Sequence, residues 1–152
     1  ATGALTRFAE LSVARAIATL TAAEIAIGYL AGATLEDAET GAGMVAIAMG
    51  KMGAHELNYS SDIDLICLFD DSRYDTAAIL DARAAFVRIT RKLAAMLGER
   101  TSDGYVFRTD LRLRPDPAVT PVCLSMDAAE RYYESVGRTW ERAAYISWKA
   151  TT

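Results

Sequence analysis

The spacing of apolar residues predicts three helices along the chain. Residues 4–30 form an Ala-rich stretch with a broad apolar face, which indicates one long helix. Residues 75–100 repeat apolar side chains every three or four positions, as amphipathic helices do. The positions expected to face the core in this second helix are Ile79, Ala82, Phe86, Ile89, Leu93, Met96 and Leu97. A last helix is expected from an N-cap at Ser125 to about Ile146.

Three other segments have the pattern of strands. Residues 44–49 are an apolar run bounded by glycines, and residues 62–69 are a second run that ends at an Asp-Asp-Ser sequence. Residues 105–114 alternate apolar and polar side chains, so their even-numbered positions share a polar face before prolines end the strand. Residues 28–43 mix Gly, Thr and acidic residues and are expected to form a loop.

This order of elements predicts an α+β fold, in which a small mixed and mostly antiparallel sheet is flanked by helices. The chain has 152 residues, 52% of them hydrophobic, which is enough for one buried core. We expect a single compact domain made of an N-terminal helix and loop (1–42), a core (43–125) and a C-terminal helix that packs on the core (126–152). Because neither end looks like a natural terminus, the chain is expected to be a fragment of a longer protein.

Composition narrows the classes of function. A net charge of −4 and a pI near 5.0 argue against a general nucleic-acid binder, which needs a basic surface. Charged residues interrupt the first helix too often for a bilayer span, and no signal peptide is visible. Cys67 and Cys123 lie in apolar segments without metal-ligand spacing, which indicates buried free thiols. We therefore expect a cytoplasmic protein whose partners are neither nucleic acid nor membrane.

Asp62 and Asp64 stand at the start of the second predicted strand. The two-residue period places both carboxylates on one face, roughly 6.5–7 Å apart at their Cα atoms. Ile66 and Leu68 follow on the same face, so the carboxylates are expected at the rim of the sheet. Two such acids repel each other unless a cation neutralises them, and Mg²⁺ prefers oxygen ligands. Taken alone, an Asp-x-Asp pair is more often an exposed acidic strand cap.

A third acid strengthens the functional interpretation. Asp110 lies on the polar face of the strand at 105–114, and Arg112 and Arg114 share that face. Three carboxylates and two guanidinium groups suit two metal ions and a phosphoryl group. The alternative is an exposed ladder of charges that neutralise one another.

Residues before the Asp-x-Asp strand could also contact a phosphate. Gly50 at a strand end lets backbone N–H groups approach a phosphate closely, and Lys51 follows it. Ser60 and Ser61 add hydroxyl groups beside the expected metal. A P-loop is excluded because the glycine spacing is wrong and Met52 stands where Ser or Thr is required.

Three sequence blocks resemble one enzyme family. They are GKMGAHELNYSSDIDLI at 50–66, FRTDLRLRP at 107–115, and Tyr132-Tyr133 followed by GRTWERAA at 137–144. In this order they resemble the bacterial bifunctional glutamine synthetase adenylyltransferase/adenylyl-removing enzymes, which belong to the polymerase β-type nucleotidyltransferase superfamily. That superfamily usually has Gly-Ser before its Asp-x-Asp strand, and Lys51 in place of the Ser is itself typical of the enzyme family.

The resemblance implies a nucleotidyltransferase fold and a set of site residues. Asp62, Asp64 and Asp110 would bind Mg²⁺, two ions in all, and act in catalysis. Gly50, Lys51, Ser60, Ser61, Arg112 and Arg114 would bind the nucleotide and phosphate, with ADP or ATP and phosphate as substrates or products. The expected partner is glutamine synthetase with its adenylylated tyrosine, joined in the full-length enzyme by the nitrogen signalling protein PII.

Enzymes of this family carry two related domains with opposed activities. One attaches AMP to a glutamine synthetase tyrosine, and the other removes it by phosphorolysis and releases ADP. The wording at 58–63 and the Trp-Glu-Arg block resemble the N-terminal, adenylyl-removing domain. One departure is Ser147-Trp148, where the family usually has a basic residue near position 147.

Three alternatives remain open at this point. The first is ATP-dependent adenylylation of glutamine synthetase. The second is another small polymerase β-type nucleotidyltransferase, such as one acting on aminoglycosides, although the Trp-Glu-Arg block and Lys51 argue against it. The third is a regulatory domain that binds nucleotide or glutamine synthetase without turnover. The presence of all three acids disfavours this alternative.

Overall fold

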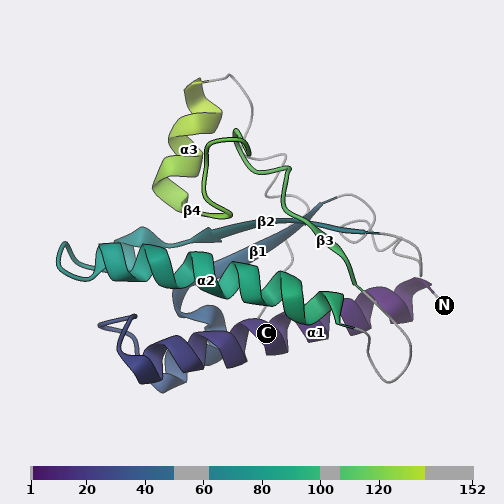
Figure 1. The fold of residues 1–152 in the computed structure, drawn as a ribbon, viewed down its shortest axis with the longest axis horizontal. Coiled ribbons are helices and arrows are strands. Elements are labelled where there is room, and N and C mark those ends of the chain that lie inside the picture. Colours follow the sequence, from purple (N-terminus) through teal and green to yellow (C-terminus); the bar gives the residue numbers. More distant parts are fainter. Residues whose placement is uncertain (1, 50–61, 100–106, 136–152) are drawn as a thin grey trace.

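The computed structural model describes residues 2–49, 62–99 and 107–135 (Figure 1). Its elements are α1 (Thr2–Ile27), the 3-10 segment η1 (Leu35–Gly43), β1 (Met44–Met49), β2 (Ile63–Phe69), the 3-10 turn η2 (Asp71–Arg73), α2 (Ile79–Gly98), β3 (Thr109–Asp110), β4 (Cys123–Ser125) and α3 (Met126–Ser135). Helices flank a small mixed sheet, so the predicted α+β class is confirmed. No helix in the described part of the chain has both the length and the apolar character needed to cross a bilayer.

Strand β2 is the centre of the sheet. On one edge it pairs with β1, antiparallel, from Met44↔Phe69 to Met49↔Asp64. On the other edge two short strands pair with it in parallel: β3 beside Ile63 and Asp64, and β4 beside Cys67 to Phe69. The longest pairing is therefore antiparallel, and α2 provides the crossover that a parallel β2–β3 pair requires.

Side chains at alternate positions of β2 pack into two separate cores. Ile63, Leu65, Cys67 and Phe69 lie in the larger core, which α1 and α2 cover. Ile66 and Leu68 lie in a smaller core with Leu124 of β4 and Ala129 of α3. Figure 1 shows α1 and α2 on one side of the sheet and α3 on the other.

The helices agree with the sequence pattern, with small differences at their ends. Helix α1 ends at Ile27, where Gly28 takes a φ of 97°. Helix α2 begins at Ile79 because the Asp75 carboxylate accepts the Ala78 N–H at 2.9 Å and closes a turn first. Met96 was expected in the core but is 42% exposed, because it lies at the border of the buried stripe.

The expected strand over 105–114 is shorter than predicted. Residues 105–106 lie outside the described part of the chain, and β3 ends at Asp110. The Arg112 N–H donates to the Asp110 carboxylate at 2.9 Å, and this local bond turns the chain away from the ladder. Further along the same edge, β2 pairs with β4, a strand that the sequence pattern did not predict.

The sequence predicts the start and end of the last helix and a loop at 28–43. The Ser125 hydroxyl accepts the Ala128 N–H at 3.1 Å, which confirms the N-cap of α3. The last helix is described only to Ser135, so its expected end near residue 146 lies outside the described residues. The expected loop at 28–43 contains η1, where the Asp37 carboxylate accepts the Thr34 N–H at 2.7 Å.

Candidate functional site

Three carboxylates lie at the end of the sheet where β2 begins. Asp62 directly precedes β2, Asp64 is the second residue of β2, and Asp110 is the last residue of β3. Asp64 and Asp110 are partners in the parallel register, so their side chains leave the sheet on the same face. That face also carries Ile66 further along β2, which makes the acids the rim of the smaller core.

The three acids influence one another electrostatically. The pKa of Asp64 is raised, first by burial and then by the negative charges of Asp110 and Asp62. The positive charge of Arg112 opposes this rise but does not cancel it. The site therefore favours a bound positive charge.

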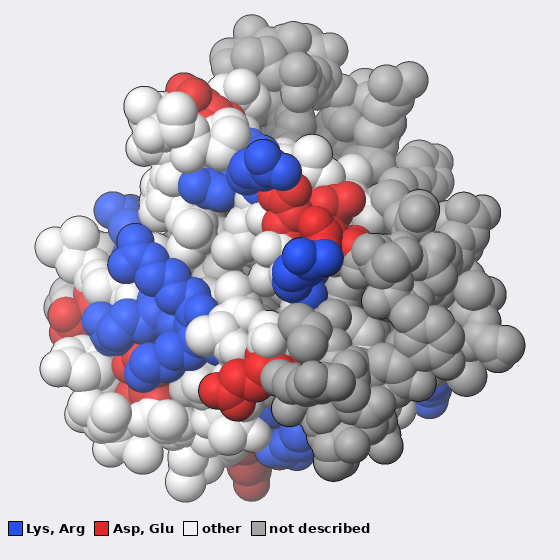
Figure 2. Space-filling model, turned by 45° about the vertical axis from the view of Figure 1, so that its right-hand side comes forward, with Lys and Arg blue, Asp and Glu red and all other residues white. Residues whose placement is uncertain are grey.

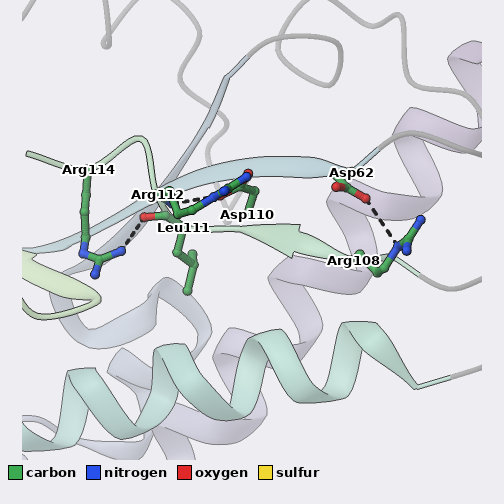
Figure 3. Close-up of polar contacts among 6 residues, drawn as sticks. All are labelled: Asp62, Arg108, Asp110, Leu111, Arg112 and Arg114. Atoms are coloured by element: carbon green, nitrogen blue, oxygen red, sulfur yellow. Dashed lines mark hydrogen bonds and ion pairs between the residues drawn. The ribbon is translucent and has the colours of Figure 1, made fainter. Parts of the chain in front are cut away.

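Two arginines already lie against these acids (Figure 3). The Arg112 guanidinium donates to both oxygens of Asp110, from Nε at 2.9 Å and from the terminal nitrogen at 2.7 Å. These bonds lower the pKa of Asp110 to about 2. Arg108 Nε lies 3.4 Å from Asp62 Oδ1. Figure 2 shows the result on the surface, with acidic side chains near the centre of the view and basic ones directly beside them.

Parity predicts Arg108 on the same polar face as Asp110, although the predicted site does not include it. Its position two residues before Asp110 in the alternating segment was the signal that could have identified it. Its side chain is 74% exposed, so it is free to turn towards a ligand.

Arg114 lies apart from the acids. Its guanidinium donates to the carbonyl oxygens of Leu111 at 2.6 Å, Pro117 at 2.9 Å and Thr120 at 3.2 Å. Figure 3 shows its side chain directed away from Asp110. The structure therefore brings Arg112 to the predicted site, while Arg114 holds the loop between β3 and β4.

An open hollow of about 650 Å³ is lined by two of the three acids, Asp62 and Asp110. Both ion pairs line it, and its opposite wall is formed by Ala94, Ala95 and Gly98 of α2. Small side chains on α2 leave room beside charged groups on the sheet edge, so a polar or anionic ligand can approach the acids from this side.

The carboxylate oxygens are of the ligand type that Mg²⁺ prefers. Hard cations take oxygen ligands, and the repulsion that raises the pKa of Asp64 is the effect a cation would relieve. Within the described residues, no three acidic, histidine or cysteine side chains are arranged as a metal site, and Asp62 and Asp110 instead contact arginines. Gly50, Lys51, Ser60 and Ser61 lie outside the described part of the chain.

Comparison with known proteins gives a consistent result. The family model described as glutamate-ammonia ligase adenylyltransferase matches residues 1–151. A relative from a Bradyrhizobium species is 54% identical over 145 residues, and one from Bradyrhizobium diazoefficiens is 53% identical over 149, covering 95% and 98% of this chain. A relative from Caulobacter vibrioides is 49% identical over 145 residues, or 95% of this chain.

Each of these relatives is named a bifunctional glutamine synthetase adenylyltransferase/adenylyl-removing enzyme. The chain spans 15% of the length of each. The family match covers nearly every residue, the three acids included. The chain belongs to the glutamate-ammonia ligase adenylyltransferase family.

Proposed function

We propose that this chain is a nucleotidyltransferase unit that acts on glutamine synthetase and removes AMP from an adenylylated tyrosine by phosphorolysis. The observation that carries the proposal is the pairing of Asp64 with Asp110 on one face of the sheet, with Asp62 directly before β2 and an open hollow lined by Asp62 and Asp110. The names of the relatives support glutamine synthetase as the target. The sequence at 58–63 resembles the adenylyl-removing domain, which supports removal of AMP over its attachment.

In this proposal Asp62 and Asp64 would hold Mg²⁺, and Asp110 would complete the site. When bound, the metal would supply the positive charge that stabilises phosphoryl oxygens during in-line displacement. To serve as ligands, Asp110 would have to leave Arg112 and Asp62 would have to leave Arg108. This exchange would free both guanidinium groups at the hollow.

The freed arginines would bind the reacting phosphates. Guanidinium groups form paired hydrogen bonds with phosphate oxygens, so Arg108 and Arg112 would orient inorganic phosphate towards the α-phosphorus of the AMP group. An oxygen of that phosphate forms the new bond to the α-phosphorus, and the bond from phosphorus to the tyrosine oxygen breaks. The tyrosine oxygen leaves with the electron pair and takes a proton, so the products are ADP and unmodified tyrosine.

The test is to incubate the full chain with adenylylated glutamine synthetase, Mg²⁺ and phosphate, and to measure ADP. We expect ADP release that Asp64→Asn abolishes, because the metal loses a ligand. Asp116→Asn is the matched control, since Asp116 is an exposed acid outside the site. Incorporation of AMP from ATP without ADP release from the adenylylated enzyme would reverse the proposed direction, and absence of both reactions would contradict the proposal.

A further inference from the structure

The exposed face of α2 is strongly basic. Between Asp81 and Glu99 the helix carries four basic residues and no acidic one, in a chain whose net charge is −4. The basic residues are Arg83, Arg88, Arg91 and Lys92. We call these four residues the α2 basic face. Figure 2 shows a patch of basic side chains to the left of the acidic group, over α2.

Most of this charge is not neutralised by neighbouring side chains. Arg88 pairs with Glu24 of α1 at 2.8 Å. Arg83, Arg91 and Lys92 are exposed and form no ion pair with any residue that the structure describes. Unpaired cations held close together on one rigid helix repel one another, and a bound anionic partner would relieve this repulsion.

The α2 basic face leads directly to the hollow beside the acids. Ala94 and Ala95, which line the hollow, follow Arg91 by three and four positions, about one turn of helix. From Arg83 to Lys92 the face is about 13 Å long at 1.5 Å per residue. An extended peptide of about four residues covers the same distance.

We propose that the α2 basic face binds an acidic stretch of the protein substrate next to the tyrosine that enters the hollow. The inference rests on the proposed function for the identity of the group in the hollow. A short acidic peptide matches the length of the face and its sign of charge. A nucleic acid fits less well, because its phosphate backbone would extend beyond a face only about 13 Å long.

The direct test measures binding without any reaction. Two synthetic peptides carry a central unmodified tyrosine, one with a run of Asp and Glu beside it and one with Asn and Gln at the same positions. We expect the full chain to bind the acidic peptide at least tenfold more tightly in calorimetry at low salt. Arg91→Glu should reduce this preference, and Arg91→Glu combined with Lys92→Glu should abolish it. Both changes are at exposed positions, and unchanged thermal unfolding would show that the variants are folded.

Arg15→Glu is the matched control, because it makes the same change at an exposed arginine of α1 outside the α2 basic face. It should keep the full preference for the acidic peptide. Preference retained in the double variant would overturn the proposal. Tighter binding of a single-stranded oligonucleotide of equal charge would overturn the choice of partner.

The adenylylated forms of the two peptides separate this inference from the proposed function. If both inferences hold, the double variant raises KM for the acidic peptide about tenfold and leaves kcat unchanged. If the acidic peptide binds but releases no ADP, the proposed reaction fails and the docking surface stands. If both peptides release ADP with equal KM, the reaction stands and the docking surface fails.

Discussion

At the scale of single residues, Asp64 is a site residue that lowers the stability of the fold. Burial and two neighbouring carboxylates raise its pKa, so its charge destabilises the folded state at neutral pH. Because the folded pKa lies above the unfolded one, this cost is present above the folded pKa and disappears as the pH falls below the unfolded value. A cation bound in the proposed metal site would relieve this destabilisation.

Asp64→Asn should consequently raise the melting temperature of the metal-free protein at pH 7 while removing activity. The gain should shrink as the pH falls, because the wild-type carboxyl group then becomes neutral as well. Thermal unfolding in a chelator at pH 7 and at pH 4 measures both effects. Asp62→Asn is the control and should give a smaller gain, since Asp62 is 53% exposed and contacts Arg108. A lower melting temperature for Asp64→Asn would contradict this account.

Asp110 has the opposite behaviour, because Arg112 stabilises its charged form and lowers its pKa to about 2. A lowered pKa contributes stability above the unfolded value and loses it as the pH falls towards 2. Arg112→Gln should return the pKa of Asp110 towards its ordinary range, as measured by a carboxyl-carbon NMR titration. Arg108→Gln serves as the comparison and should leave the Asp110 titration in place, since Arg108 contacts Asp62. An unchanged Asp110 pKa in Arg112→Gln would show that another group lowers it.

At the scale of elements, one aromatic side chain of α2 packs at the centre of its contact with the sheet. Phe86 is fully buried, stacks on Phe69 of β2 with ring centroids 4.9 Å apart, and meets the edge of Tyr74 at 5.8 Å. Because α2 also forms a wall of the hollow, loss of this packing would disturb both the core and the site.

Phe86→Ala should lower the free energy of unfolding by about 3–5 kcal/mol, the usual cost of an aromatic side chain deleted from a core. Chemical denaturation measures the change. Leu80→Ala in the same helix is the control, because Leu80 is 70% exposed, and it should change stability by less than about 0.5 kcal/mol. Equal effects of the two changes would mean that α2 does not depend on this aromatic contact.

The elements also show where sequence patterns succeed. Helices α1 and α2 and strands β1 and β2 lie where the patterns at residues 4–30, 75–100, 44–49 and 62–69 predict them. Their signals are local, because the helices repeat apolar side chains every three or four residues and the strands are continuous apolar runs. Strand β4 was missed because three residues carry no usable period, and its existence depends on pairing with β2.

In the candidate site too, the sequence predicts positions within one strand but not contacts between segments. Parity predicts a shared face for Asp62 and Asp64 and a polar face for Asp110 within its own strand, and the β2–β3 register places Asp110 beside Asp64. It failed for Arg114, because parity holds only while the strand continues, and the chain turns after Asp110. The contact of Arg108 with Asp62 joins two segments of the chain, so no pattern within one segment could show it.

At the scale of the whole molecule, the reactivity of two buried thiols measures whether the larger core is folded. Cys67 and Cys123 are free, fully buried and partners in the β2–β4 register. Burial raises the pKa of Cys67 to about 12 and raises that of Cys123 well above its ordinary value. Reactive thiolate is therefore scarce in the folded protein.

We expect neither thiol to react with a disulfide reagent in the native protein and both to react after unfolding in urea. The rate of labelling in intermediate urea should follow the global unfolding transition, because both thiols lie inside the sheet. Ala84→Cys at an exposed position of α2 is the control and should be labelled at once without urea. Rapid labelling of the native wild type would show that β4 separates from β2 more easily than the rest of the fold opens.

The shared edge of β2 has a consequence for how this family can change. Strands β3 and β4 each keep their own register with β2, so residues 111–122 connect two points that are fixed independently. Insertions that keep Arg112 and Arg114 leave Asp110 and Cys123 in register with β2, and the entropic cost of a longer loop grows slowly. New recognition features can therefore evolve next to the acids without altering the acids themselves.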